Sequence, residues 1–430
     1  MRKLFTLAFA LTNLIFIVSC SDNDPEKKKS YEEIADESVI SAQTAVDAAA
    51  AVDATATGVT DASVFDGWTA AAIHGQLGGA NTAPTSAIAP NSAIEVDVTS
   101  NISVNTTWDA DSVYILKTRV TVLDGITLTI EPGTIIKGDA SKSGADAAVL
   151  MIAKGGKIMA EGSLASPIIF TSTEDDIQPG NLSGSTLVNT DNAKWGGLVI
   201  LGKAPVSAKT DNPQIEGVDA QDTNGQYGGS DAADDSGVLK YVSIRHGGAE
   251  LADGNEINGL SLGGVGSGTS ISYIEVYGNK DDGIEFFGGT VDVTNALVYT
   301  VGDDALDVDQ SYAGTIDNFL VYVDNASDEG LEIDGREGTL DDSFVIKNGS
   351  IMSVGSASTT ADFKAKAKGE VNNVVFEDGA IKLSASFDTE TYIETEDAAS
   401  NVASGSLKFT KVSATEFAVY TKSFDDLIGL

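Results

Sequence analysis

The feature that most constrains the fold is a short β-rich pattern that recurs through the second half of the chain. One set of runs lies at residues 242–245, 274–277, 296–299 and 319–322, and a second set follows in the same repeats at 259–262, 283–286, 305–308 and 330–333. Equivalent positions lie 22 to 32 residues apart, a spacing typical of solenoids. Within each run apolar residues alternate with others, as in a strand with one buried face.

The segments between the runs narrow the choice of solenoid. None of them has the helical pattern of about 10–15 residues that a βαβ sheet needs, and a leucine-rich horseshoe fits no better. Coils of two or three short parallel strands remain. The same texture extends from about residue 94 almost to the C-terminus without a composition break. The sequence therefore predicts one all-β domain, a parallel β-helix, over residues 94–430.

Three segments nearer the N-terminus carry a family resemblance. They are residues 120–134 (VTVLDGITLTIEPGT), residues 155–162 (GGKIMAEG) leading to 167–172 (PIIFTS), and residues 195–202 (WGGLVILG). Together they resemble a family of Bacteroidota surface lipoproteins with right-handed parallel β-helix folds, similar in architecture to pectate lyases. The resemblance covers roughly residues 95–350. It implies the fold and its right hand, and it implies no established activity.

The N-terminus has the pattern of an export signal. Arg2 and Lys3 precede an apolar run that is too short to span a membrane, and the run ends at residues 17–20 (IVSC). These four residues resemble a bacterial lipobox, in which the cysteine is acylated and becomes the first residue of the mature chain. Cys20 is the only cysteine, so no internal disulfide can form and an acyl anchor is its predicted role. A plain signal peptide with an incidental cysteine is the alternative.

The chain after Cys20 begins with an acidic stretch, residues 21–26 (SDNDPE). It resembles the signal that sends Bacteroidota lipoproteins to the outer face of the outer membrane, although any lipoprotein also needs a solvated tether. Residues 30–90 predict a spacer, because residues 41–60 are rich in Ala, Thr, Val and Asp without a sustained apolar stripe, and a weak helix is predicted over 31–51. The predicted organisation is a lipoprotein signal peptide over 1–19, an acylated flexible tether and spacer over 20–93, and the β-helix over 94–430.

Charge limits the partners of this chain. The 26 Lys and Arg residues against 64 Asp and Glu residues give a net charge of −38. Such a chain repels phosphate backbones, so we expect no nucleic-acid partner, and it attracts cations. With only two histidines, multi-histidine metal sites are excluded.

Acidic residues fall into register on the second set of runs. Strands stack about 4.8 Å apart, so equivalent residues of successive coils form columns. Acidic residues occupy the outward positions that align with Ser261 in the following coils, and further acids align on either side of this column. These are the predicted metal ligands, namely Asp282, Glu285, Asp304, Asp307, Asp309, Glu329, Glu332 and Asp334. Like charges on neighbouring strands are destabilising, and calcium is the counter-charge that suits clustered carboxylates.

Two other interpretations of this acidic patch stay open. It can be a solvated acidic face without metal. Alternatively, Lys364 following Glu332 and Lys366 following Asp334 in the next coil can neutralise its end.

The first set of runs predicts a second outward column. Arg245, Tyr277, Tyr299 and Tyr322 occupy equivalent positions and suggest an aromatic strip for sugar rings. The alternatives are that a loop or the N-terminal segment covers the strip, or that the tyrosines stack only to stabilise the coils.

No catalytic residues are predicted. Residues 302–304 (GDD) resemble the paired aspartates of polygalacturonases, but the histidine and the Arg-Ile-Lys triplet of those enzymes have no counterpart here. The sequence favours a surface-displayed, lipid-anchored protein of the outer membrane that binds glycan or divalent cations. A calcium-dependent polysaccharide lyase or glycoside hydrolase is the alternative.

Overall fold

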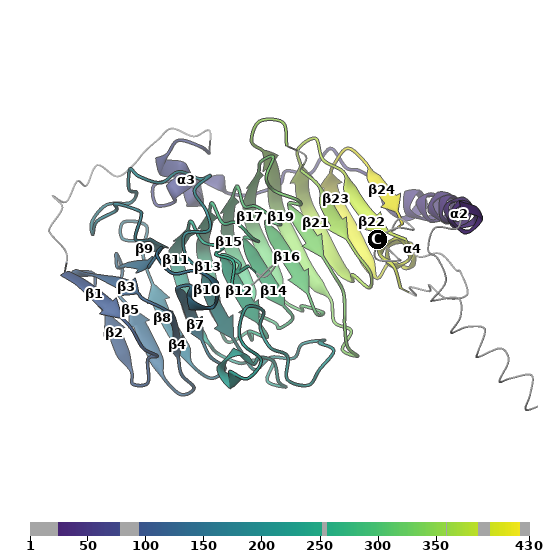
Figure 1. Ribbon diagram of the computed structural model, residues 1–430. Coiled ribbons are helices and arrows are strands. Elements are labelled where there is room, and N and C mark those ends of the chain that lie inside the picture. Colours follow the sequence, from purple (N-terminus) through teal and green to yellow (C-terminus); the bar gives the residue numbers. More distant parts are fainter. Residues whose placement is uncertain (1–24, 78–93, 252–255, 358, 386–395, 422–430) are drawn as a thin grey trace, which may run out of the picture.

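The computed structural model describes residues 25–77, 94–251, 256–357, 359–385 and 396–421. Its body is a stack of coils in which every strand of the two main sheets pairs in parallel with its neighbours. The stack is elongated, with β1 at one end and β24 at the other (Figure 1). This confirms the predicted right-handed parallel β-helix.

A ten-stranded sheet forms one side of the stack. Its order is β24 (Phe417–Tyr420), β22 (Ile381–Ser384), β20 (Ala361–Phe363), β18 (Leu331–Ile333), β16 (Leu306–Asp309), β14 (Ile284–Phe287), β12 (Leu260–Gly263), β10 (Leu198–Leu201), β7 (Val149–Ile152) and β4 (Arg119–Val122). As predicted, alternate residues such as Leu260, Phe286 and Val308 point into a core that excludes water, and all three are fully buried. The residues between them face away from that core.

A fourteen-stranded sheet forms the rest of the wall. Its main order is β1 (Ile94–Val98), β3 (Ser112–Leu116), β6 (Ile135–Gly138), β9 (Ile168–Ser172), β11 (Gly237–Arg245), β13 (Ser270–Tyr277), β15 (Asp292–Tyr299), β17 (Thr315–Val323), β19 (Phe344–Ser353), β21 (Gly369–Phe376) and β23 (Leu407–Ser413). Three further strands join it, namely β2 (Thr106–Trp108), β5 (Thr127–Ile130) and β8 (Lys157–Glu161).

This second sheet is bent along its length. β8 pairs with the first half of β11 and β9 with the second half, so each long strand runs along two faces of the β-helix. Each long strand turns at one residue with left-handed φ between 48° and 57°, and these residues are Tyr241, Tyr273, Asn295, Asn318, Asn348, Asn373 and Lys411. Asparagine tolerates this conformation better than most residues, which explains its presence in four successive coils.

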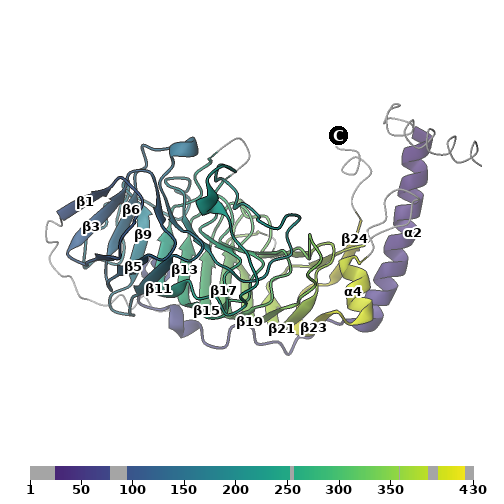
Figure 2. The same ribbon diagram turned by 90° about the horizontal axis from the view of Figure 1, so that it is seen from below.

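Helices are few. They are α2 (Pro25–Ala49), α3 (Ala70–Ile73) and α4 (Ala398–Ser404), with the 3-10 turns η1 (Ala62–Phe65), η2 (Gly144–Asp146) and η3 (Thr223–Gly225). α2 lies across the last coil against α4 and β24, crosswise to the stack (Figure 2). There the Gln43 side chain accepts from the Val419 N–H at 2.9 Å and donates to the Phe417 carbonyl at 2.9 Å. This amide therefore satisfies one carbonyl and one N–H group on the outer edge of β24.

Residues 50–77, which we call the strap, differ from the predicted flexible tether. The strap leaves the last coil and crosses the fourteen-stranded sheet back toward β13. Asn373 accepts from the Thr57 N–H at 2.8 Å, and Asn318 accepts from the Thr60 N–H at 2.9 Å. Phe65 and Trp68 are fully buried against the sheet. The weak helix predicted over 31–51 corresponds to α2.

Candidate functional site

The predicted acidic column exists. Ser261, Glu285, Asp307 and Glu332 are direct neighbours on β12, β14, β16 and β18. Two residues that the sequence analysis missed extend it, because Asp362 on β20 follows Glu332 and Lys382 on β22 follows Asp362. We call this column and its acidic flanks the acidic ladder.

The flanking acids also align. The Asp304 N–H donates to Asp282 Oδ1 at 2.9 Å, and the Glu329 N–H donates to Asp304 Oδ1 at 2.7 Å. On the other flank the Asp334 N–H donates to the Val308 carbonyl at 2.8 Å, which places Asp334 beside Asp309. All eight predicted metal ligands therefore lie on one surface of three successive coils.

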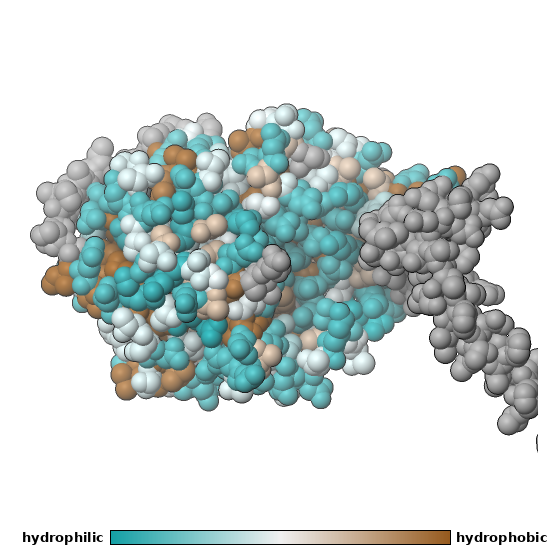
Figure 3. Space-filling view, viewed as in Figure 1, coloured by the Kyte–Doolittle hydropathy of each residue, from teal (hydrophilic) through white to brown (hydrophobic). Residues whose placement is uncertain are grey.

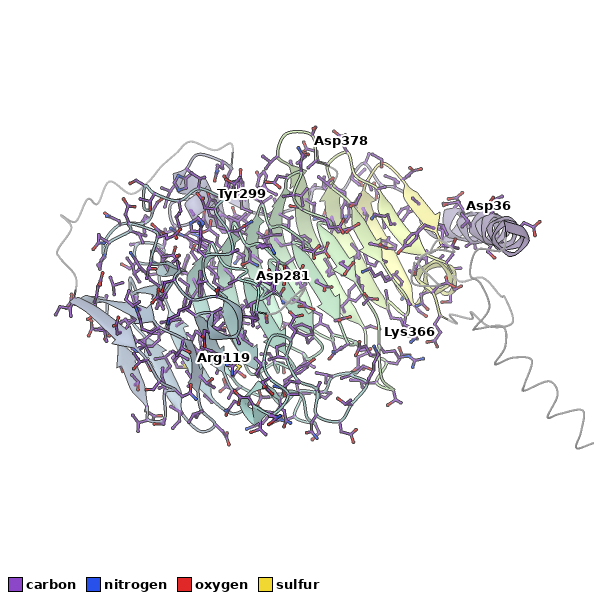
Figure 4. All side chains as sticks on the ribbon, viewed as in Figure 1. Asp36, Arg119, Asp281, Tyr299, Lys366 and Asp378 are labelled. Atoms are coloured by element: carbon purple, nitrogen blue, oxygen red, sulfur yellow. The ribbon has the colours of Figure 1, made fainter. Side chains whose placement is uncertain are left out.

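Most of this ladder is buried, although its side chains point away from the core. Glu285, Asp307 and Asp282 are 6–8% exposed. Part of the cover is a long connection over residues 205–235, which we call the excursion. Its Ser207 N–H donates to the Gln310 carbonyl at 2.9 Å, and its Tyr227 hydroxyl bonds Gln310 Oε1 at 3.1 Å. The face around Asp281 carries many hydrophilic side chains (Figures 3 and 4).

Burial and mutual repulsion favour the protonated form of these carboxyls. Burial, with Glu332 nearby, raises the pKa of Asp304 to about 9, and burial with Asp334 nearby raises the pKa of Asp309 to about 7. The pKa values of Asp282, Glu285 and Asp307 rise well above the ordinary range for the same two reasons. The ladder therefore lacks sufficient positive charge of its own.

Carboxylate oxygens converge at three places on the ladder. The groups are Asp281–Asp282–Asp303, Asp282–Glu285–Asp307 and Asp304–Glu329–Glu332, and within each the oxygens lie within 4.8 Å of one another. In the second group all three residues are buried, and Asp307 Oδ1 has no hydrogen-bond partner. Clustered oxygens of this kind are the ligands that calcium prefers.

The lysine register was predicted wrongly. Glu332 pairs with Asp362, so Lys364 follows Asp334 rather than Glu332. The long Lys364 side chain still forms an ion pair with Glu332 and lies 3.8 Å from Asp334. Lys382 forms an ion pair with Glu329. These two lysines therefore partly neutralise the C-terminal half of the ladder, and neither of them pairs with Glu285 or Asp307.

The predicted tyrosine column also exists in register, with Arg245, Tyr277, Tyr299 and Tyr322 side by side. The rings of Tyr277 and Tyr299 stack at 5.6 Å, and those of Tyr299 and Tyr322 lie 5.3 Å apart. The prediction that they form a solvent-facing strip is wrong, because the strap covers them. Arg245, Tyr277 and Tyr299 are only 1–4% exposed. Tyr299 lies near the upper edge in Figure 4, close to the strap.

A buried carboxylate holds the strap over this column. Glu275 accepts from the Ala70 and Ala71 N–H groups at 2.8 and 3.0 Å, at the start of α3. Beneath it, Ser243 donates to Glu275, and Arg245 donates to Ser243 Oγ at 2.7 Å. No sequence pattern indicates this role of Glu275, since its partner Ala70 lies 205 residues earlier in the chain.

Arginine and histidine contacts lie away from the ladder in the part of the chain that the structure describes. Arg119 pairs with Asp222, and Arg336 pairs with Glu396 and Asp341. His74 bonds Ser183, and His246 bonds the Asp191 carbonyl. The ladder thus has lysines as its basic neighbours.

A scan against protein families matches residues 100–426 to a family described as a pectate-lyase-like β-helix domain. No curated protein and no solved structure matches the chain. Among the described residues, no helix is both long and apolar enough to cross a membrane. Cys20 lies outside the described residues, so its acylation stays a prediction.

Proposed function

The chain belongs to the family of pectate-lyase-like β-helix domains, and from that premise we propose that it is a lipid-anchored surface protein that binds divalent cations, and through them glycan, on the acidic ladder. The observation that carries the proposal is the buried Asp282–Glu285–Asp307 group with its unpartnered Asp307 oxygen. Buried polar atoms are nearly always satisfied, and a cation would satisfy this one. Calcium, which takes several oxygen ligands, is the proposed ion.

The glycan part of the proposal rests on the family and on charge. Pectate, from which the family takes its name, is an anionic polysaccharide, and a protein of net charge −38 repels such a polymer. Bound divalent cations reverse that repulsion locally and can bridge carboxylates of protein and glycan. The tyrosine column is not the proposed glycan surface, because the strap covers it.

Binding is favoured over catalysis. A calcium-dependent lyase or hydrolase, the alternative, needs a base or acid placed over the ladder. Lys364 and Lys382 are held in ion pairs with the ladder's own acids, and the described arginines and histidines contact other residues. Incubation with polygalacturonate should therefore yield neither the absorbance of an unsaturated lyase product nor the new reducing ends of hydrolysis. Steady formation of either product would favour the enzyme.

Thermal unfolding tests the cation site. Calcium that binds only the folded protein adds about 2.7 kcal/mol to its stability at a hundredfold excess over Kd, so Tm should rise with millimolar CaCl₂ and fall with chelator. Asp307→Asn should blunt that rise. It should also raise Tm in chelator, because a neutral amide replaces a carboxyl that the repelling cluster must otherwise hold in its protonated form.

Asp292→Asn is the matched control, since Asp292 is an exposed acid on the other sheet and its bond to the Thr315 N–H survives the change. It should leave the calcium response intact. A wild-type melting curve that calcium does not move would contradict the proposal.

A further inference from the structure

The excursion brings a carboxylate from outside the repeat onto the ladder. Asn258, just before β12, connects the two: its Nδ2 donates to Glu216 Oε1 at 3.0 Å, to Ser261 Oγ at 3.2 Å, and to Glu285 Oε2. Asn258 is 1% exposed. One amide nitrogen, which has two hydrogens, thus stands among three oxygens that come from three separate segments.

The other end of the same amide is unsatisfied. Asn258 Oδ1 is buried and has no hydrogen-bond partner, as is also true of Asp307 Oδ1 in the neighbouring group. An amide group has a donor end and an acceptor end, and a half-turn about χ2 exchanges them. In the structure the amide therefore presents its donor end to the crowded oxygens, and its acceptor end has no partner.

We propose that Asn258 and Glu216 are further ligands of the cation site formed by Asp282, Glu285 and Asp307. When a cation binds, the amide turns, and Oδ1 takes the place of Nδ2 beside the Glu216 and Glu285 carboxylates. The NH₂ group, which carries partial positive charge, thus occupies the place that the cation takes when it binds. The inference rests on the proposed function, and it adds a carbonyl oxygen and a fourth carboxylate to the three on the strands.

This arrangement makes the ion a cross-link. Glu216 belongs to the excursion, whereas Asp282, Glu285 and Asp307 belong to the coils. The excursion already packs on the ten-stranded sheet through Ile215, Val218 and Tyr227. A cation held from both sides fastens it further, so binding should be visible in the excursion as well as in the melting curve.

Calorimetric titration with CaCl₂ tests the ligand role of Asn258. Asn258→Asp keeps an oxygen and should bind at least as tightly as the wild type, and Asn258→Leu, of similar size without oxygen, should weaken binding at least about tenfold. Asn401→Leu is the control, because Asn401 is equally buried but donates to the Ala367 carbonyl near α4. No calcium binding by the wild type would overturn the proposed function itself. Wild-type affinity in Asn258→Leu would overturn this inference alone.

Proteolysis supplies a readout that needs no core variant. Lys209 is the one trypsin site in residues 205–235, and its side chain is 78% exposed. Saturating CaCl₂ should slow cleavage after Lys209 in the wild type severalfold and should have little effect in Glu216→Gln. Equal cleavage rates with and without calcium, at concentrations where the wild type binds it, would overturn the cross-link.

Discussion

At the scale of single residues, the carboxyl groups of the ladder lie where burial and mutual repulsion disfavour their ionised form. Asp304, Asp309 and Glu216 have pKa values raised to about 9, 7 and 7, with burial as the main cause. In the unfolded chain each titrates near pH 4. The folded protein therefore binds more protons than the unfolded chain throughout the neutral range.

This difference predicts a pH dependence of stability. Where the folded state holds more protons, the free energy of unfolding falls as pH rises, until each group passes its folded pKa. In chelator, Tm should therefore fall between pH 6.5 and pH 8.5. His246, whose pKa is lowered to about 4 by burial, is neutral in the folded state across this window and does not reverse the trend.

Thermal scans in chelator at the two pH values check this, with CaCl₂ as the comparison. A bound cation stabilises the ionised carboxylates, so the fall in Tm should shrink when calcium saturates the site. A Tm that rises with pH in chelator would contradict the protonation of the ladder.

At the scale of elements, the strap is held by a few large side chains. Trp68 is fully buried, meets the Tyr241 ring edge-on at 5.4 Å, and donates from Nε1 to the Val64 carbonyl at 2.8 Å. Replacing a buried tryptophan with alanine typically costs about 3–5 kcal/mol. Trp68→Ala should therefore lower the free energy of unfolding in denaturant titrations by that amount.

Solvent access to the tyrosine column distinguishes the loss of the strap's cover from a general loss of packing. Trp68→Ala should increase quenching of tyrosine fluorescence by acrylamide below the unfolding transition. Val52→Ala, at a 41% exposed position in the same strap, should change neither measurement. Normal stability in Trp68→Ala would show that the strap contributes little to the fold.

Sequence could predict the repeating elements and not the segments that cover them. The strands repeat because each coil meets the same core, so the alternation of Ile284 with Phe286, or of Leu306 with Val308, reveals the register. The contacts of Trp68 with Tyr241, or of Glu216 with Asn258, join non-repeating segments, and no periodicity records them. The place of Asp362 in the column can be predicted from the sequence, because residues 361–363 (ADF) keep the apolar–acidic–apolar pattern of residues 331–333 (LEI). The predicted strand in this coil begins two residues later than β20 does, and this shift causes the wrong register of Lys364.

At the scale of the whole molecule, the proposed location depends on residues before the described chain. Cys20→Ala should release the protein from membranes and abolish labelling by a fatty-acid analogue, because the thiol is the proposed acylation site. Fractionation and metabolic labelling measure both effects. Ser21→Ala, one residue away, should keep the label.

For surface display, protease added to intact cells should remove the wild-type protein, and full protection would place it on the periplasmic leaflet.

The path of α2 and the strap sets an order of events during synthesis. Gln43 bonds the edge of β24, and the strap then crosses β23, β21 and β17, so the partners of Gln43 and the strap lie up to 376 residues later in the chain. A ribosome delivers residues 25–77 first, yet their docking surfaces are complete only when residue 420 has been made. The coils can stack one by one as they emerge, while the beginning of the chain waits. Docking of residues 25–77 can therefore only follow the stacking of the coils, and it fastens the last coil through Gln43.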